Sequence, residues 1–351
     1  MNKPEITFLV TCAGGATVPA LVAELARSAM FDFRVLGVDA RPPVAAQRLL
    51  DGVFPAPLGR DPGYVPALCE IIRREKVDVL LPGSDEEAFA ASAALPALEA
   101  AGARVIVSPK PVLDLIADKF RTYQSLQAAG VPVPEYTLAV DAAAVREAVL
   151  SYGFPRRTVI FKPVAGRGGR GLYVLCGQDA PPAWLGGGAR ERRLEGFDPT
   201  AEAIAPLLEG PTLVMPCLGV PAYDADILAL GGGRHVVAVR QRTNPAGIPF
   251  TGNTLLADPG VSAYCRDVAR VLGLDALHDI DLMSGPDGRP VVLEVNPRPS
   301  GSMVATLAAG FPLLDWAVAR LIGAAFTPRE PERQVEILAK PGTFAVPAGE
   351  N

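Results

Sequence analysis

The stretch LEVNPRPSG, residues 293–301, decides the fold of this chain. It has the pattern of a short strand that runs into a loop with two prolines. Because successive side chains of a strand point to opposite faces, Glu294 and Asn296 share a face. Upstream, residues 276–283 have the pattern of a second strand, and the sequence Pro-Asp-Gly-Arg at 286–289 is a strong turn signal. The stretch therefore predicts the second strand of a β-hairpin.

A hairpin centred on that turn places Asp281 opposite Glu294. Two facing carboxylates repel each other and destabilise a sheet unless a cation lies between them. With the amide oxygen of Asn296 they form a hard oxygen cluster, which Mg²⁺ prefers where it also binds nucleotide phosphates. Arg298 follows closely enough to hold an anion beside the metal. The hairpin alone leaves a second interpretation open, a surface hairpin with solvated acidic residues.

The composition is that of an ordinary globular protein. The 351 residues suffice for two or three domains, with 49% apolar and 20% charged residues. A net charge of -5 without a basic run argues against nucleic acid or an anionic membrane as a partner. No signal-peptide pattern and no apolar stretch of membrane-spanning length occurs, so we expect a cytoplasmic protein.

Cysteine and histidine are scarce. Without a CxxC pair, five cysteines and two histidines exclude a zinc ribbon and disfavour a disulfide framework. His235 and His278 have the chemistry of general bases, although a solvent-edge strand position is the commoner fate of such residues. We expect the cysteines to be buried, reduced thiols: Cys12, Cys69, Cys176, Cys217 and Cys265.

Residues 1–108 alternate strand and helix patterns. A β-branched strand at 6–11, a helical pattern at 18–29 and a strand at 34–38 form a βαβ unit, and the alternation then repeats. This pattern predicts a small doubly wound α/β domain with a parallel sheet.

Two features of this domain each have two possible interpretations. The pair Gly14-Gly15 has two interpretations, an NAD site or a bare turn between strand and helix. The full GxGxxG spacing of an NAD site is missing. Ser84 and Asp85 open a helix, so these residues either cap it or face a substrate.

The middle of the chain carries two lysine elements. A predicted helix at 111–130 contains Lys119, and residues 159–174, VIFKPVAGRGGRGLYV, place Lys162 on a strand before a glycine-rich loop. Such glycine density lets backbone N–H groups approach an anion closely. The loop is not a Walker loop, because no GK[ST] precedes a helix. We predict a hairpin that closes over phosphates, with a merely mobile loop as the alternative.

The rest of the chain has the patterns of further strands and helices around an irregular segment. Residues 180–199 are irregular and predict a surface insertion. Strands are expected at 212–215, 223–230, 235–242 and 334–338, and helices at 200–208, 261–272, 304–310 and 313–322.

In their order, these features resemble the ATP-grasp superfamily over nearly the whole chain. The similarity is greatest to the branch with carbamoyl-phosphate synthase large-chain halves, biotin carboxylase and stand-alone carboxylate–amine ligases. The resemblance implies an α/β and α+β architecture, an ATP-grasp fold preceded by a small doubly wound, Rossmann-like pre-ATP-grasp domain. The implied parts are the pre-ATP-grasp domain (1–108), an N-terminal ATP-grasp part with the phosphate loop (109–212), a C-terminal part with the metal site (213–326) and a tail (327–351).

The resemblance also implies a set of binding residues. Family members often carry glutamates in the hinge and at the ribose, where this chain has Pro216 and Ala222, so Asp224 is the expected ribose contact. The implied metal ligands are Asp281, Glu294 and Asn296. The implied nucleotide contacts are Lys119, Lys162, Gly166, Gly168, Gly169 and Gly171 for the phosphates, and Met215, Cys217 and Leu218 for adenine.

The implied catalytic residues are Arg298, Lys162 and Arg240. In related ligases the strand of Arg240 and Arg242 approaches the acceptor carboxylate, which suits the planar guanidinium group. A solvated edge strand is the alternative.

The implied reaction activates a small carboxylate, such as an amino acid, as an acyl phosphate and couples it to an amine, with release of ADP and phosphate. The implied cofactors are ATP and two Mg²⁺ ions, for which Mn²⁺ can substitute, and the implied assembly is a homodimer. The alternatives are a carbamoyl-phosphate-synthase-like phosphorylation of bicarbonate or carbamate, and a non-catalytic nucleotide-binding module. A biotin carboxylase and a Rossmann oxidoreductase fit the sequence less well.

Overall fold

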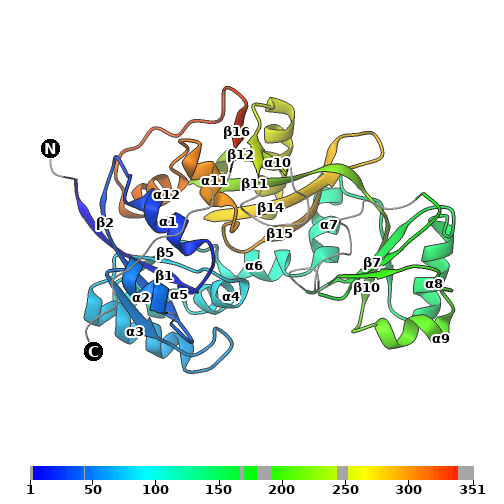
Figure 1. Ribbon diagram of the computed structural model, residues 1–351, viewed down its shortest axis with the longest axis horizontal. Helices are drawn as coiled ribbons and strands as arrows, with labels where there is room; N and C mark the ends of the chain where they lie inside the picture. The colour runs from blue at the N-terminus through cyan, green and yellow to red at the C-terminus, as the bar shows by residue number, and fades with distance from the viewer. Residues whose placement is uncertain (1–2, 43, 167–169, 180–190, 243–251, 339–351) are drawn as a thin grey trace.

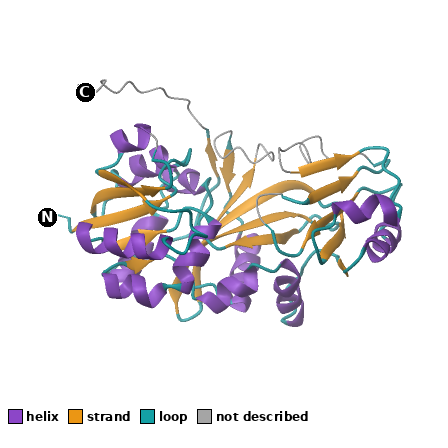
Figure 2. Cartoon of the chain, turned by 90° about the horizontal axis from the view of Figure 1, so that it is seen from below, coloured by secondary structure: helices purple, strands orange, loops and turns teal. Residues whose placement is uncertain are grey.

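Three β-sheets follow one another along the chain in the computed structural model, each with helices packed against it (Figures 1 and 2). The structure describes residues 3–42, 44–166, 170–179, 191–242 and 252–338. Figure 1 shows the first sheet in blue, the second as a separate green lobe, and the third above and between them.

The first sheet is parallel and has the strand order β3-β2-β1-β4-β5. Helices cover both of its faces, so its central strand β1 is apolar and buried along nearly its whole length. The order reverses between β1 and β4, and this arrangement confirms the predicted doubly wound sheet. Its elements are β1 (Glu5–Thr11), α1 (Val18–Leu25), β2 (Asp32–Asp39), α2 (Val44–Leu49), β3 (Gly52–Pro55), α3 (Tyr64–Glu75), β4 (Val79–Leu81), α4 (Asp85–Ala93), α5 (Leu95–Ala101) and β5 (Arg104–Val105).

The second sheet has the order β6-β10-β7-β8-β9 and is antiparallel except for the β8–β9 pair. The predicted surface insertion contains β9 among its described residues, because Glu191–Leu194 pair with β8. The elements of this part are α6 (Lys110–Ile116), α7 (Lys119–Ala128), β6 (Thr137–Ala139), α8 (Ala142–Ser151), β7 (Val159–Pro163), β8 (Leu172–Leu175), β9 (Glu191–Leu194), α9 (Ala201–Ile204), η1 (Ala205–Leu207) and β10 (Thr212–Pro216).

The single helix predicted at 111–130 is wrong, since α6 ends at Ile116 and α7 begins at Lys119. The reason is Asp118, whose carboxylate accepts hydrogen bonds from the backbone N–H groups of Phe120 and Arg121. This N-cap starts a new helix and fixes the position of Lys119 at its first turn.

The third sheet is antiparallel and has the order β15-β14-β11-β12-β13-β16. The predicted hairpin is confirmed, because Asp281 on β14 lies opposite Glu294 on β15. Its elements are β11 (Gly219–Gly231), β12 (Arg234–Arg242), β13 (Asn253–Leu255), α10 (Pro259–Leu272), β14 (Leu277–Ser284), β15 (Pro290–Asn296), α11 (Met303–Ala308), α12 (Leu313–Ile322) and β16 (Val335–Ile337).

The domain boundaries expected from the sequence stay predictions. The boundary at 212/213 falls inside β10, which pairs with β6 and β7. Within the segment expected to be a tail, β16 pairs with β13 and extends the third sheet.

The expectations for cysteine and histidine need correction. Only Cys69 and Cys265 are buried, whereas Cys12, Cys176 and Cys217 are half-buried; all five are free thiols. Both histidines lie inside the protein rather than at a solvent edge, because the sheet faces that carry them are covered. No helix among the described residues is long and apolar enough to cross a membrane.

Candidate functional site

A row of four charged residues crosses the third sheet, with one residue from each of four neighbouring strands. Glu294 on β15 lies opposite Asp281 on β14, Asp281 opposite Asp224 on β11, and Asp224 opposite Arg240 on β12. The exposed fraction of the side chains falls along this row from 27% at Glu294 and 20% at Asp281 to 4% at Asp224 and 0% at Arg240. The row therefore has an accessible end and a buried end.

At the buried end, Arg240 is paired within the protein. Its Nε lies 3.1 Å from Oδ2 of Asp226, and its Nη1 lies 3.3 Å from Oδ2 of Asp224. The solvated-edge interpretation of this strand is therefore wrong. The expected contact of Arg240 with a substrate carboxylate stays a prediction, and in this structure the guanidinium group is completely enclosed. The assignment of Asp224 as the ribose contact also stays a prediction; its buried carboxylate is held by Arg240 and Arg242.

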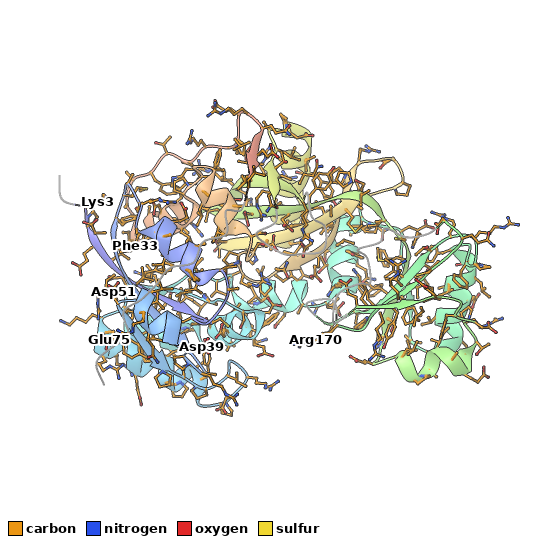
Figure 3. All side chains as sticks on the ribbon, in the orientation of Figure 1. Lys3, Phe33, Asp39, Asp51, Glu75 and Arg170 are labelled. Atoms are coloured by element: carbon orange, nitrogen blue, oxygen red, sulfur yellow. The ribbon has the colours of Figure 1, made fainter. Side chains whose placement is uncertain are left out.

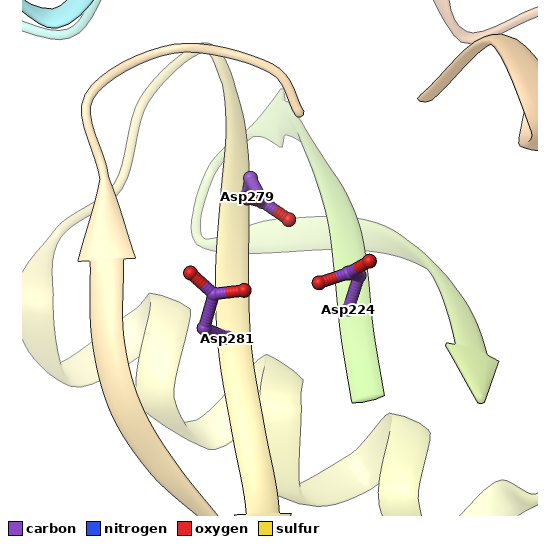
Figure 4. A group of neighbouring side chains, drawn as sticks. All are labelled: Asp224, Asp279 and Asp281. Carbon is purple, nitrogen blue, oxygen red and sulfur yellow. The ribbon is translucent and has the colours of Figure 1, made fainter. Parts of the chain in front are cut away.

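Three carboxylates converge in the middle of the row: Asp224, Asp279 and Asp281 (Figure 4). One oxygen from each lies within 4.8 Å of the others. Burial and the neighbouring carboxylates raise the pKa of Asp279 well above its usual range and that of Asp281 to about 7. The Arg242 guanidinium bridges Asp224 and Asp281, and the Asn296 amide donates to Asp279 and Asp281 over 2.9 and 3.1 Å.

The donor set fits a divalent cation. Asp281, Glu294 and Asn296 offer the oxygen atoms that Mg²⁺ prefers. In addition, Oδ1 of Asp279 is buried and has no hydrogen-bond partner among the described residues. A cation beside these groups would offset both the unpaired oxygen and the crowding of negative charge.

Asp279 is the residue of this cluster that sequence reasoning missed. The signal was present in the sequence His-Asp-Ile-Asp at 278–281, since Asp279 precedes Asp281 by two positions on a strand and shares its face.

At the accessible end, Lys119 connects the hairpin of β14 and β15 to the glycine loop. Its Nζ lies 3.1 Å from Oε2 of Glu294 and donates a 2.7 Å hydrogen bond to the carbonyl oxygen of Gly166. Its backbone N–H donates to the carbonyl oxygen of Val164 over 2.9 Å. Burial opposes ionisation of Glu294, but Lys119 and Lys162 hold the pKa of this carboxyl below its usual range. The structure therefore brings both predicted lysine elements to the hairpin.

Lys162 is 8% exposed on β7. Burial and the charge of Lys119 lower the pKa of Lys162 to about 8, although Glu294 and Asp281 act in the opposite direction. An anion such as a phosphate group would favour the charged form of Lys162.

The glycine loop is described only at its two ends, and Gly168 and Gly169 lie outside the described residues. Gly166 contacts Lys119 as above. Gly171 has a positive φ of 71°, and a Cβ at this position would lie 3.0 Å from Cδ of Pro163. A side chain at position 171 is therefore strained, which explains the glycine at the return of the chain into β8.

The predicted adenine contacts lie at the end of β10. Met215 and Leu218 are buried, and Cys217 is half-buried. They belong to an apolar cluster between the second and third sheets, which also includes Ile160, Val174, Ala222, Met283 and Val291. An apolar lining of this kind suits a purine ring.

A cavity of about 390 Å³, here named the cleft cavity, lies between the second and third sheets. The residues that line it include Lys119, Gly166, Glu294 and Asn296. Arg298 lies just outside, with its Nε 3.0 Å from Oδ1 of Asp85 on α4. The hairpin of β14 and β15, the start of α7 and the glycine loop thus share one cavity.

A family model described as "ATP-grasp in the biosynthetic pathway with Ter operon" matches residues 209–341, from β10 to β16. The solved N5-carboxyaminoimidazole ribonucleotide synthetase in complex with ADP superposes with a TM-score of 0.66 at 16% identity, over 96% of this chain and 81% of that one. The chain carries an ATP-grasp domain. A second solved structure, the biotin carboxylase domain of the Hydrogenobacter thermophilus 2-oxoglutarate carboxylase with MgADP and bicarbonate, superposes with a TM-score of 0.65 at 16% identity, over 92% of this chain and 71% of that one.

Among curated proteins, the carbamoyl phosphate synthase large chain of Rubrobacter xylanophilus is 25% identical over 293 residues. That match covers 80% of this chain and 25% of the relative. The chain therefore spans about a quarter of the length of this relative.

Proposed function

We propose that this protein is an ATP-dependent ligase that couples a small carboxylate to an amine and releases ADP and phosphate. The observation that carries the proposal is the contact of Lys119 with both Glu294 and Gly166. This one side chain joins the carboxylate of the metal hairpin to the loop that would cover phosphates.

In the proposed reaction, an oxygen of the substrate carboxylate attacks the γ-phosphorus of ATP. The bond from this phosphorus to the β-phosphate oxygen breaks, and ADP leaves. The amine nitrogen then attacks the acyl carbon, the C–O bond to phosphate breaks, inorganic phosphate leaves, and the nitrogen loses a proton. This chemistry needs positioning and charge neutralisation rather than a nucleophilic side chain.

Each residue of the accessible end has a role in this scheme. Lys119 and Lys162 bind phosphate oxygens, and Arg298 holds the transferred phosphoryl group near the mouth of the cleft cavity. Asp281, Glu294 and Asn296 are the proposed ligands of Mg²⁺ or Mn²⁺, which would neutralise phosphate oxygens while charge moves onto ADP. The apolar cluster at Met215 and Leu218 receives adenine.

A second candidate is the phosphorylation of bicarbonate or carbamate. It is favoured by the similarity to a carbamoyl phosphate synthase large chain and by bicarbonate in the named biotin carboxylase structure. Both reactions use the same phosphoryl-transfer groups, so the acceptor of the phosphoryl group distinguishes them.

The test is ADP release by the full chain with Mg²⁺ and ATP. Amino acids, small carboxylates and bicarbonate are supplied alone and in pairs with amines. We expect ADP release that requires both a carboxylate and an amine. Release with bicarbonate alone would favour the second candidate, and tight ATP binding without turnover on any pair would contradict both.

A further inference from the structure

A β-bulge interrupts the hairpin that carries the proposed metal ligands. From the turn as far as Leu282, the pairs of the two strands run in step, with Leu282 opposite Val292. The next pair joins Asp281 to Glu294, so the register shifts by one residue. Leu293 is therefore the extra residue of a β-bulge in β15.

The bulge determines which face of the sheet carries Glu294. If the register on the turn side of the bulge continued, Leu293 would lie opposite Asp281. Glu294 would then lie opposite Ile280, which is buried in the core. A shift by one residue exchanges the two faces of a strand. The extra residue is therefore what brings Glu294 beside Asp281 and to the lining of the cleft cavity.

The apolar residues of β15 show the same exchange of faces. Val292 and Val295 belong to one core cluster, although they stand three positions apart. A regular strand returns to the same face every two residues, so an odd separation indicates an extra residue between them. Leu293 packs against the apolar cluster between the second and third sheets, and Glu294 lines the cleft cavity.

Two tyrosine hydroxyls hold the backbone of the bulge. The N–H of Val292 donates to the hydroxyl oxygen of Tyr264 on α10 over 2.9 Å. The carbonyl oxygen of Leu293 accepts a 2.7 Å hydrogen bond from the hydroxyl of Tyr123 on α7. A bulge disrupts the ladder of hydrogen bonds locally, so its backbone groups need other partners. Here side chains from two helices supply them.

Both tyrosines connect the bulge to α7, the helix of Lys119. Tyr123 belongs to this helix, and the hydroxyl of Tyr264 donates over 2.8 Å to the carbonyl oxygen of Pro132, in the segment that follows it. In addition, Oε2 of Glu294 lies 3.1 Å from Nζ of Lys119 at the start of the helix. Three consecutive residues of β15 are thus tied to one helix and its exit.

The position of α7 gives this connection a functional consequence. Figure 1 shows α7 between the third sheet and the lobe of the second sheet, and Figure 3 shows the side chains of this junction, with Arg170 labelled. Lys119 contacts both Glu294 and the carbonyl oxygen of Gly166. The placement of the proposed metal ligand relative to the proposed phosphate site therefore depends on how β15 is fixed to α7.

We propose that Tyr123 and Tyr264 are positioning residues for Glu294: they hold the bulge and thereby fix this carboxylate beside Lys119, where it is to bind the metal. The inference rests on the proposed function, because it concerns a ligand of the proposed Mg²⁺ or Mn²⁺ ion. The two hydroxyls act through the backbone next to Glu294. Loss of a partner that orients a metal ligand typically weakens metal binding about 10- to 100-fold.

Removal of the two hydroxyls tests this role. Tyr123→Phe and Tyr264→Phe each keep the aromatic ring and lose the hydrogen bond to the bulge. Binding of Mn²⁺ to the ADP complex of the full chain is measured by electron paramagnetic resonance. We expect weaker Mn²⁺ binding in each single variant and a decrease of at least about tenfold in the double variant.

The matched control is Tyr152→Phe, which removes a hydroxyl that is hydrogen-bonded to Thr137 over 2.8 Å in the second sheet's lobe. Each loss of a hydroxyl lowers the free energy of unfolding, so urea denaturation of every variant accompanies the titration. We expect the control to lose stability but to keep its Mn²⁺ affinity. Unchanged Mn²⁺ affinity in the double variant, or an equal decrease in the control, would overturn the inference.

A crystal structure of the double variant without metal gives a second readout. We expect Oε2 of Glu294 to leave its 3.1 Å contact with Nζ of Lys119. If Glu294 stays in place, the inference is wrong regardless of the Mn²⁺ affinities.

Failure of this inference and failure of the proposed function give different results. If Glu294→Gln weakens Mn²⁺ binding but the double tyrosine variant does not, the metal site stands and the positioning role is wrong. If Glu294 moves in the double variant but Glu294→Gln binds Mn²⁺ as well as the unmodified chain, the positioning role stands and the proposed metal ligand is wrong.

Discussion

The two ends of the charged row on the third sheet contain similar side chains in different surroundings. At the buried end, Arg240 is completely enclosed and pairs with Asp224 and Asp226. At the accessible end, Glu294 is 27% exposed at the side chain, pairs with Lys119 and lines a cavity. The charged groups of the buried end pair with one another, although Nη2 of Arg240 and Oδ1 of Asp226 have no hydrogen-bond partner among the described residues, whereas Glu294 at the accessible end lines a cavity. Charge on a strand therefore does not distinguish a structural pair from a binding site, but access does.

The largest expected effect is on the stability of the buried end. Arg240→Met leaves Asp224 and Asp226 without their shared cation, and removal of one partner of a buried pair typically costs about 3–5 kcal/mol. We expect the free energy of unfolding, measured by urea denaturation, to fall by this amount. Arg242→Met, at a side chain that is 25% exposed, should cost less.

A contradicting result for the buried end is simple to recognise. If Arg240→Met unfolds at the same urea concentration as the unmodified protein but loses ADP release, Arg240 acts on substrate and the two ends do not differ as described.

A smaller effect concerns the charge of Lys162. Burial and Lys119 lower its pKa to about 8, so the free protein loses this charge as the pH rises through 8. Bound phosphate favours the charged lysine, so nucleotide binding takes up a proton above pH 8. Affinity for ADP should therefore fall by up to about tenfold between pH 8 and pH 9, or about 1.4 kcal/mol.

Calorimetric titration of ADP at several pH values measures this effect. Lys162→Met should bind ADP more weakly at pH 7 and should lack the decrease above pH 8. A decrease of the same size in Lys162→Met would show that another group titrates.

The smallest effect tests the support of the accessible end. The buried Tyr123 hydroxyl, on the helix of Lys119, donates a 2.7 Å hydrogen bond to the carbonyl oxygen of Leu293, next to Glu294. Tyr123→Phe removes this bond and should lower the free energy of unfolding by about 1 kcal/mol. Tyr136→Phe, at an exposed hydroxyl that donates to Oε1 of Gln127 over 3.3 Å, is the control and should change stability less. An equal loss in both variants would contradict a specific role for the Leu293 contact.

Local sequence signals were sufficient to predict much of the accessible end. The expected opposition of Asp281 and Glu294 is present in the structure, but the register shifts between Asp281 and Leu282, and the turn at 286–289 alone does not predict this irregularity. Lys119 was assigned by resemblance, but its contact with Glu294 joins segments 175 positions apart, which no local pattern predicts.

The buried end was not predictable for a physical reason. Alternation on β12 correctly placed Arg240 and Arg242 on one face, but burial depends on what covers that face. Here Ser302 and Thr306, from the segment around α11, donate to Asp224 and Asp226 and enclose the pair. The burial of His278 was not predictable for the same reason. Its ring lies 2.6 Å from Ser108, in the segment after β5, which is distant in the sequence.

The most direct test of the central claim, that the accessible end binds metal and nucleotide, is a titration of Mn²⁺ with the ADP complex followed by electron paramagnetic resonance. The unmodified chain is compared with Glu294→Gln, which keeps the shape of the side chain but removes its charge. We predict that Glu294→Gln weakens Mn²⁺ binding at least about tenfold, or about 1.4 kcal/mol, with an unchanged unfolding transition. Equal Mn²⁺ affinity in the two proteins would contradict the account.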